Sequence, residues 1–164
     1  PLRKGALPSK DYAETFNFLR GVEKTFKKVT AIQISVTNTL KKVKSMNVAL
    51  AQSNADVGVM DEELSKLRDS LLEMDEELNG NRSKNEPGEK NNPTVYPRLY
   101  TAARIASGST YGPTKLALDN LALANKSIGL IEKQLTANNQ MIIDLSYELR
   151  QAGAPWVEGD NIPD

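Results

Sequence analysis

The stretch Ser107–Lys115, SGSTYGPTK, holds residue types that bind nucleotide phosphates: two glycines and a Thr-Lys pair before an apolar run. A phosphate-binding loop needs a lysine directly after its second glycine, and free backbone N–H groups that follow a strand. Here three residues separate Gly108 from Gly112, and Pro113, which has no N–H, follows the second glycine. We therefore predict a helix-to-helix connection, capped by Thr114 or Gly112, and no bound cofactor.

Other catalytic and metal-binding chemistry is limited by two missing residue types. The chain has no histidine and no cysteine, which excludes the commonest general base, the usual zinc ligands, thiolates and disulfides. Two acidic runs remain, Asp61–Glu63 and Glu73–Glu77, but adjacent carboxylates on a helix point in different directions and neither run has calcium-loop spacing. We therefore predict no metal site, no catalytic set and no enzymatic activity for this chain.

The overall charge gives no sign of a nucleic-acid partner. Lysine plus arginine and aspartate plus glutamate both number 21, and Phe26 is the only aromatic residue interleaved with the lysines between Lys24 and Lys44. No apolar run approaches the roughly 20 residues of a membrane span. The sequence begins at Pro1, with neither a signal peptide nor an initiator methionine, so we expect the C-terminal fragment of a larger protein.

Apolar residues recur in steps of three and four, the spacing of helices that bury one side. We predict helices over about 9–52, 56–79, 97–107 and 114–152, with an exposed loop over 79–96. Ser9 is placed to cap the first helix, and Gly153 and Pro155 to end the last. The residues expected to be buried include Tyr12, Phe16, Leu19, Val22 and Phe26 in the first helix, and Val57, Met60, Leu64, Leu67, Leu71, Met74 and Leu78 in the second. In the third they are Tyr96, Leu99, Tyr100, Ala103 and Ile105, and in the last Ala117, Leu121, Ala124, Ile128, Ile131, Leu135, Asn138, Ile142, Leu145 and Leu149.

The helix lengths predict the architecture. The first and last helices would each span close to 60 Å, and the two shorter helices laid end to end would match them. We therefore predict one all-α domain over 1–164, an elongated antiparallel bundle with two long helices and a middle arm broken into two; a regular four-helix bundle is the competing arrangement. Asn138 lies on the buried stripe of the last helix, where an amide either fixes the helix register or contacts a ligand.

Candidate interaction residues gather around the broken arm and the C-terminal end. Tyrosine and arginine side chains there could stack on or hydrogen-bond a sugar, and the single tryptophan either packs on the bundle end or marks a docking surface. These residues are Tyr96, Arg98, Tyr100, Arg104, Tyr111 and Trp156. Apolar residues off the main stripes would instead favour a self-associating coiled coil. They are Phe18, Ile34, Leu118, Leu130 and Ile143.

Two stretches, YGPTKLALDNLALANKSI and LSYELRQAGAPWV, resemble the helical C-terminal region of bacterial proteins built on sortilin-like, BNR-repeat β-propellers, often labelled glycosyl hydrolases. Pro113-Thr114 and Gly153-Ala154-Pro155 match that family's helix boundaries, and SKDYAETFNFLRGVEKTFKKV resembles its first helix. PLRKGAL matches the family's Asp-Pro-Arg opening only loosely, and the propeller, where catalytic residues of the family would lie, is absent from this chain.

This resemblance implies an exported bacterial protein, periplasmic or associated with the outer membrane and cell surface, that is connected with carbohydrate. Its partners would be the upstream domains of the same protein, another envelope protein or a carbohydrate. Together with the lack of catalytic residue types, it leads us to expect a non-catalytic structural or interaction module. The alternatives are a glycan- or ligand-binding helical domain and a self-associating coiled coil.

Overall fold

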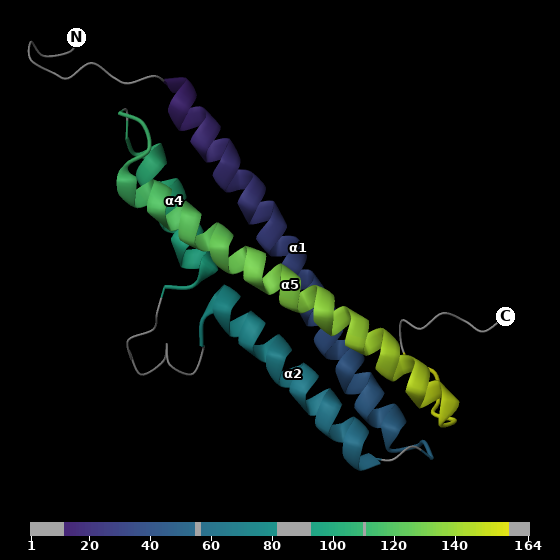
Figure 1. The fold of residues 1–164 in the computed structure, drawn as a ribbon. Coiled ribbons are helices and arrows are strands. Elements are labelled where there is room, and N and C mark those ends of the chain that lie inside the picture. The colour runs from purple at the N-terminus through teal and green to yellow at the C-terminus, as the bar shows by residue number, and fades with distance from the viewer. Residues whose placement is uncertain (1–11, 55–56, 82–92, 110, 158–164) are drawn as a thin grey trace, which may run out of the picture. The chain divides into compact units, whose positions relative to one another are not determined.

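The computed structural model describes residues 12–54, 57–81, 93–109 and 111–157, apart from the side chain of Val57. These residues form four α-helices and no strand (Figure 1). The helices are α1 (Tyr12–Leu50), α2 (Val57–Asn79), α4 (Val95–Ser107) and α5 (Lys115–Gln151). The prediction of an all-α fold with two long helices and a middle arm of two shorter ones is confirmed.

The helix ends agree with the sequence prediction to within two residues where they can be compared. Differences of two residues occur at the end of α1, which is Leu50, and at the start of α4, which begins at Val95 and thus shortens the predicted loop. Pro97 then occupies the third helical position, where a missing N–H breaks no bond because first-turn N–H groups have no partner inside the helix. Ser9 and most of the predicted loop lie outside the described residues.

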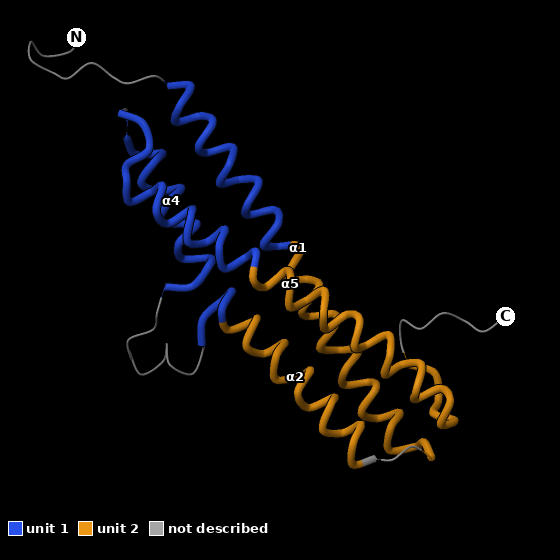
Figure 2. The backbone as a smooth tube through the Cα atoms, viewed as in Figure 1, with its two compact units in different colours: residues 1–30, 77–129 blue, residues 31–76, 130–164 orange. Residues whose placement is uncertain are grey.

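The chain divides into two compact units (Figure 2). Unit 1 comprises residues 1–30 and 77–129, and its described helical part consists of the first half of α1, the last turn of α2, all of α4 and the first half of α5. Unit 2 comprises residues 31–76 and 130–164, and combines the second halves of α1 and α5 with nearly all of α2. Within each unit the middle-arm helix runs antiparallel to α1 and α5 (Figure 1).

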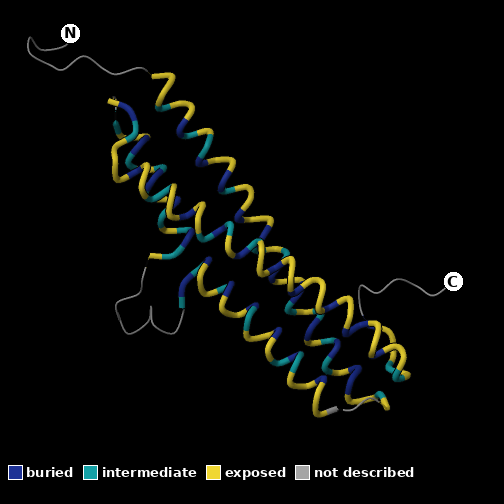
Figure 3. Tube along the Cα trace, viewed as in Figure 1, coloured by how far each residue is buried: buried dark blue, intermediate teal, exposed yellow. Residues whose placement is uncertain are grey.

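The core of unit 2 consists of large aliphatic and methionine side chains. Buried positions recur along each helix between exposed ones (Figure 3). Along α2 every described residue of the predicted stripe is buried, and all of the α5 stripe from Ile131 to Leu149 is buried as well. The least exposed large side chains of this core are Val36, Met46, Leu64, Leu67, Leu71, Met74 and Leu149.

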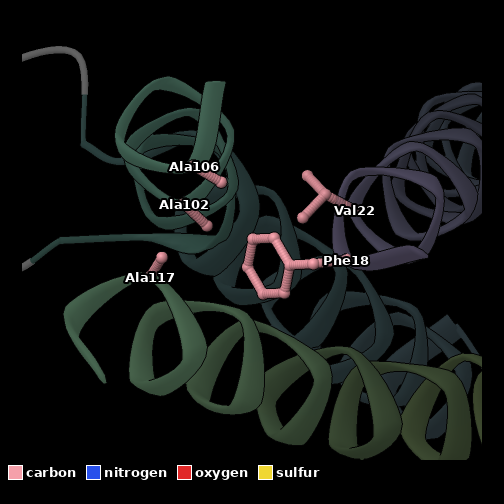
Figure 4. Packing of buried hydrophobic residues seen from close by; sticks show 5 residues of the cluster. All are labelled: Phe18, Val22, Ala102, Ala106 and Ala117. Carbon is pink, nitrogen blue, oxygen red and sulfur yellow. The ribbon is translucent and has the colours of Figure 1, made fainter. Parts of the chain in front are cut away.

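A different packing fills the end of unit 1, where one phenylalanine is surrounded by alanines. The ring of Phe18 points from α1 toward Ala102 and Ala106 of α4 and Ala117 of α5, with Val22 beside it (Figure 4). Alanine side chains let helices approach closely, and one large ring then fills the remaining space. This core therefore depends on the match between Phe18 and its small neighbours.

Phe18 also corrects the predicted register at the start of α1. Tyr12 and Phe16 were expected to be buried, yet they are 69% and 60% exposed, whereas Phe18 is 9% exposed. Phe16, Phe18 and Leu19 are all apolar, so the sequence allows two stripes here. The alanines facing Phe18 provide space for its ring, and this tertiary fit selects the second stripe.

The same alanines correct the predicted register of α4. This helix buries Val95, Leu99, Ala102 and Ala106, whereas Tyr100, which we had placed in the core, is 65% exposed. Burying the alanines brings α4 close to its neighbours, so its larger tyrosine is left facing outward. The prediction that Tyr100 is buried was therefore wrong.

At one end of unit 2, hydrogen bonds close the end of α5 and connect it to the turn after α1. Gly153 has φ of +73°, and the N–H groups of Gly153 and Ala154 donate to the carbonyls of Arg150 at 3.0 Å and Leu149 at 2.9 Å. This pattern is a Schellman motif, and it confirms Gly153 as the helix end. The N–H of Asn54, after α1, donates to the carbonyl of Ala152 at 3.0 Å, which fixes the turn after α1 against the end of α5.

Asn138 forms a contact between helices inside unit 2. Its side chain is 6% exposed, and its Nδ2 donates a hydrogen bond to Ser70 Oγ of α2 at 3.1 Å. A buried amide with a partner on only one neighbouring helix favours one register of α5 against α2. The hydrogen bond to Ser70 therefore supports the interpretation that Asn138 fixes the register of α5.

Candidate functional site

The segment that resembled a phosphate-binding loop connects α4 to α5. Gly112 has φ of +88°, and Thr114 Oγ1 accepts the N–H of Ala117 at 3.3 Å, so Thr114 caps α5. A Cβ added at Gly112 would lie 3.1 Å from Glu14 Oε2, so the connection passes close to α1. It follows a helix and turns the chain, as predicted.

The described residues contain no group of three or more Asp, Glu, His or Cys side chains that could hold a metal ion. One carboxyl has a perturbed pKa: the hydrogen bond and charge of Lys27 lower the pKa of Glu23 below its ordinary value of 4.5. The Lys27 Nζ lies 2.7 Å from Glu23 Oε1 one turn away on the solvent side of α1. This is an exposed ion pair between successive turns of one helix, a kind that contributes little to stability.

None of the described helices combines the length and the apolar character that crossing a membrane requires.

The predicted interaction residues of α4 fall on two sides of that helix. Tyr96 is half-buried, and its ring centroid lies 6.4 Å from that of Phe26 in a tilted arrangement. Tyr100 and Arg104 follow at intervals of four residues and are both exposed. Since an α-helix turns about 100° per residue, these side chains succeed one another along one side, whereas Arg98 projects from the opposite flank.

Tyr111 and Trp156, the remaining predicted residues, lie in different units. Tyr111 belongs to the α4–α5 connection of unit 1, is 47% exposed, and its N–H donates to Ser109 Oγ at 3.2 Å. Trp156 belongs to unit 2 and is 50% exposed. The guanidinium carbon of Arg150 lies 5.6 Å from the centroid of its ring, a cation–π contact that covers part of the indole.

The aromatic residues of this protein are largely outside its core. Of nine aromatic residues, six are exposed: Tyr12, Phe16, Tyr100, Tyr111, Tyr147 and Trp156. Four of the six belong to unit 1, and we call Tyr12, Phe16, Tyr100 and Tyr111 the unit 1 aromatic set. Tyrosine and arginine are enriched among the residues that dominate binding energy at protein interfaces.

Sequence reasoning missed two members of the unit 1 aromatic set, Tyr12 and Phe16. Both were placed on the buried stripe of α1, and only the competing stripe through Phe18 could have shown otherwise. The exposed ring of Phe16 lies 5.7 Å from the guanidinium carbon of Arg20, one turn further along α1. Unit 1 thus presents aromatic and arginine side chains on α1 as well as on α4.

A groove between α1 and α5 in unit 2 was also missed. It has a volume of about 560 Å³. Its described lining residues are Ser35, Asn38, Thr39, Lys41, Lys42 and Ser45 of α1 and Asn139, Ile142 and Ile143 of α5. We call it the Lys41 groove. The signal in the sequence was the run of small polar residues beside two lysines on α1, which leaves space next to α5.

Comparisons with models of known families, with curated proteins and with solved structures found no match to this chain. Function is therefore inferred from the chain's own residues, together with the resemblance described above.

Proposed function

We propose that this chain is a non-catalytic interaction module, which docks through the unit 1 aromatic set onto another protein surface. The observation that carries the proposal is the exposure of Tyr12, Phe16, Tyr100 and Tyr111, at 69%, 60%, 65% and 47%. Aromatic rings left in water lose the stabilisation that burial provides, and a partner surface can supply that burial. Arg20 beside Phe16 and Arg104 beside Tyr100 add the other residue type favoured at such interfaces.

The resemblance to the C-terminal region of sortilin-like propeller proteins suggests which surface is the partner. In that setting the bundle would pack on the propeller domains upstream in the same protein, or on another envelope protein. We further propose an exported bacterial protein, periplasmic or at the cell surface, that takes part in carbohydrate handling. This part of the proposal depends on the matches at Pro113-Thr114 and Gly153-Ala154-Pro155.

A binding measurement tests the docking surface. The upstream propeller segment and this chain would be produced separately and titrated against each other by calorimetry. We expect Tyr100→Ser to weaken binding by about 10-fold or more, since truncating an interface aromatic at a central position commonly removes 2 kcal/mol. Tyr147→Ser in unit 2 is the matched control, because Tyr147 is 60% exposed and outside the aromatic set.

The same two variants distinguish this proposal from its alternatives. Equal loss of binding in both variants, or no binding at all by the wild-type chain, would contradict docking through unit 1. Titration with an oligosaccharide in place of the propeller tests the glycan-binding alternative, in which Tyr100 and Arg104 stack on or hydrogen-bond a sugar. Binding of the sugar that depends on Tyr100 would favour that alternative over protein docking.

Self-association is a second candidate function, favoured by the exposure of apolar residues off the buried stripes. Ile34, Leu118, Leu130 and Ile143 are 58%, 47%, 55% and 59% exposed. Phe18, the fifth residue of that prediction, is instead part of the unit 1 core. The remaining four leave apolar surface on both long helices, which a second copy of the chain could cover.

A further inference from the structure

The Lys41 groove combines positive charge with an apolar side. Its described lining includes two lysines, Lys41 and Lys42, and no carboxylate. Ile142 is 5% exposed and lies toward the interior, whereas Ile143 beside it is 59% exposed. The α1 side carries the short side chains of Ser35, Asn38 and Ser45, which leave space for an incoming side chain.

The outer side of α2 in the same unit has the complementary character. Four exposed residues lie within two turns, at intervals that place them on one side of the helix. We call them the acidic ridge: Asp69, Leu72, Glu73 and Glu76. Leu72 is 48% exposed among the three carboxylates. Arg68 Nη2 lies 3.3 Å from Asp69 Oδ1, and α2 carries no lysine or arginine after Arg68, so Glu73 and Glu76 are the ridge carboxylates with no basic residue beside them on α2.

We propose that the acidic ridge of one copy of this chain occupies the Lys41 groove of a second copy. Leu72 then contacts Ile142 and Ile143, and the ridge carboxylates lie within reach of Lys41 and Lys42. Apolar contact provides the affinity, while the opposite charges at the edge select the partner face and its orientation. The proposal rests on the self-association candidate above and names the two faces that meet.

The groove and the ridge lie on different faces of unit 2, so the contact can continue from one copy to the next. The lining of the groove comes from α1 and α5, and the ridge is the side of α2 that faces solvent. A copy that uses its ridge therefore still has its groove free, and the reverse holds for its neighbour. Contacts between unlike faces extend into chains of molecules when the rotation does not close a ring.

Sedimentation analysis of the full chain tests the proposal. The monomer has a mass of 18.0 kDa. Over a roughly hundredfold range of concentration at low salt, the weight-average mass should rise past twice that value without a plateau, because mass action drives an open-ended association. Added salt should lower the mass at each concentration, since the charge pairs at the groove edge are exposed to solvent.

Two variants at exposed positions separate the faces. Asn38→Trp fills the groove and leaves the ridge intact. Leu72→Lys gives the ridge a positive charge that repels Lys41 and Lys42, and it leaves the groove intact. Each variant alone should associate at least about 10-fold more weakly than the wild type. An equimolar mixture should form a dimer that stops growing, because only one of its two possible contacts remains. Circular dichroism confirms that both variants keep their helices.

The outcomes discriminate between the proposal and the function on which it rests. A wild-type chain that stays monomeric at all concentrations contradicts both the groove–ridge contact and self-association. If the wild type associates and neither Asn38→Trp nor Leu72→Lys changes that association, the groove–ridge contact is contradicted. Self-association would then occur through another face. A dimer that forms only in the mixture of the two variants, with longer assemblies in the wild type, supports the proposal.

Discussion

The Phe18 end of unit 1 and the core of unit 2 are packed in different ways. Unit 1 places Ala102, Ala106 and Ala117 around the ring of Phe18, so that one large side chain fits among small ones. Unit 2 relies on leucine and methionine, with Leu64, Leu71 and Met46 fully buried. We expect the first kind of core to be sensitive to added volume, because the small residues leave little space around the ring, and the second to lost volume, because truncating a large side chain leaves a cavity.

Removing volume from unit 2 should have the largest effect. Leu71→Ala should lower the free energy of unfolding by about 2–5 kcal/mol, since Leu71 is 0% exposed and its loss leaves a cavity. Leu72→Ala is the control, because Leu72 follows Leu71 in the same helix but is 48% exposed. Urea unfolding measures both. Equal losses in the two variants would mean that the α2 register is wrong.

Adding volume to unit 1 should have the next largest effect. Ala102→Leu should destabilise the chain by about 1–3 kcal/mol, because the added atoms meet Phe18 and the neighbouring helices. Ala122→Leu on the exposed side of α5 is the control and should change stability little, since leucine and alanine have similar helix propensities. If Ala102→Leu were as mild as the control, the alanine-lined core would not be close-packed.

Two glycines, one in each unit, should respond to alanine with opposite signs. Gly21 lies inside α1 with nothing within 4 Å of an added Cβ, so Gly21→Ala should stabilise by about 0.5–1 kcal/mol. Gly153 has φ of +73°, so Gly153→Ala should destabilise by about 1 kcal/mol through the backbone, as its nearest neighbour is 3.9 Å away. Thermal unfolding of the two variants measures the sign of each stability change. Stabilisation by Gly153→Ala would contradict the helix ending described for α5.

The smallest effect concerns the ion pair of Glu23 in unit 1. Because Lys27 lowers the pKa of Glu23 in the folded chain, the pair stabilises at pH values above the ordinary pKa of 4.5. This contribution is lost as the pH falls below 4.5 and through the folded-state pKa, when Glu23 takes up a proton. Glu23→Gln should therefore slightly reduce stability at pH 7 and have a smaller effect at pH 2. A larger difference at pH 2 than at pH 7 would reverse the sign assigned here.

The sequence predicts the helices and the unit 2 core well because the signals there are local. The stripe from Met60 to Leu78 has no competing register, and the Gly153 ending needs only a residue that tolerates positive φ. The start of α1 and all of α4 are different, because several apolar residues compete and tertiary fit decides. Phe18 is buried and Tyr100 is exposed because alanines on the facing helices determine how closely those helices approach.

The candidate surfaces depend on the same distinction. The exposure of Tyr100 and Tyr111 agrees with their proposal as interaction residues, whereas Tyr12 and Phe16 could be added only after the register of α1 was known. The Lys41 groove could be recognised only once the packing of α1 against α5 was known. That packing places Lys41 and Ile143 on the same opening, although about a hundred residues separate them in sequence. No local pattern in either helix defines that opening by itself.

Hydrogen exchange tests the proposed docking of unit 1 most directly. Exchange of backbone amides would be compared between this chain alone and the chain mixed with the proposed propeller partner. Docking through the unit 1 aromatic set predicts slower exchange at the start of α1 and along α4, near Phe16 and Tyr100, with little change near Tyr147. Unchanged exchange in α4, or protection confined to the region of Tyr147, would contradict it.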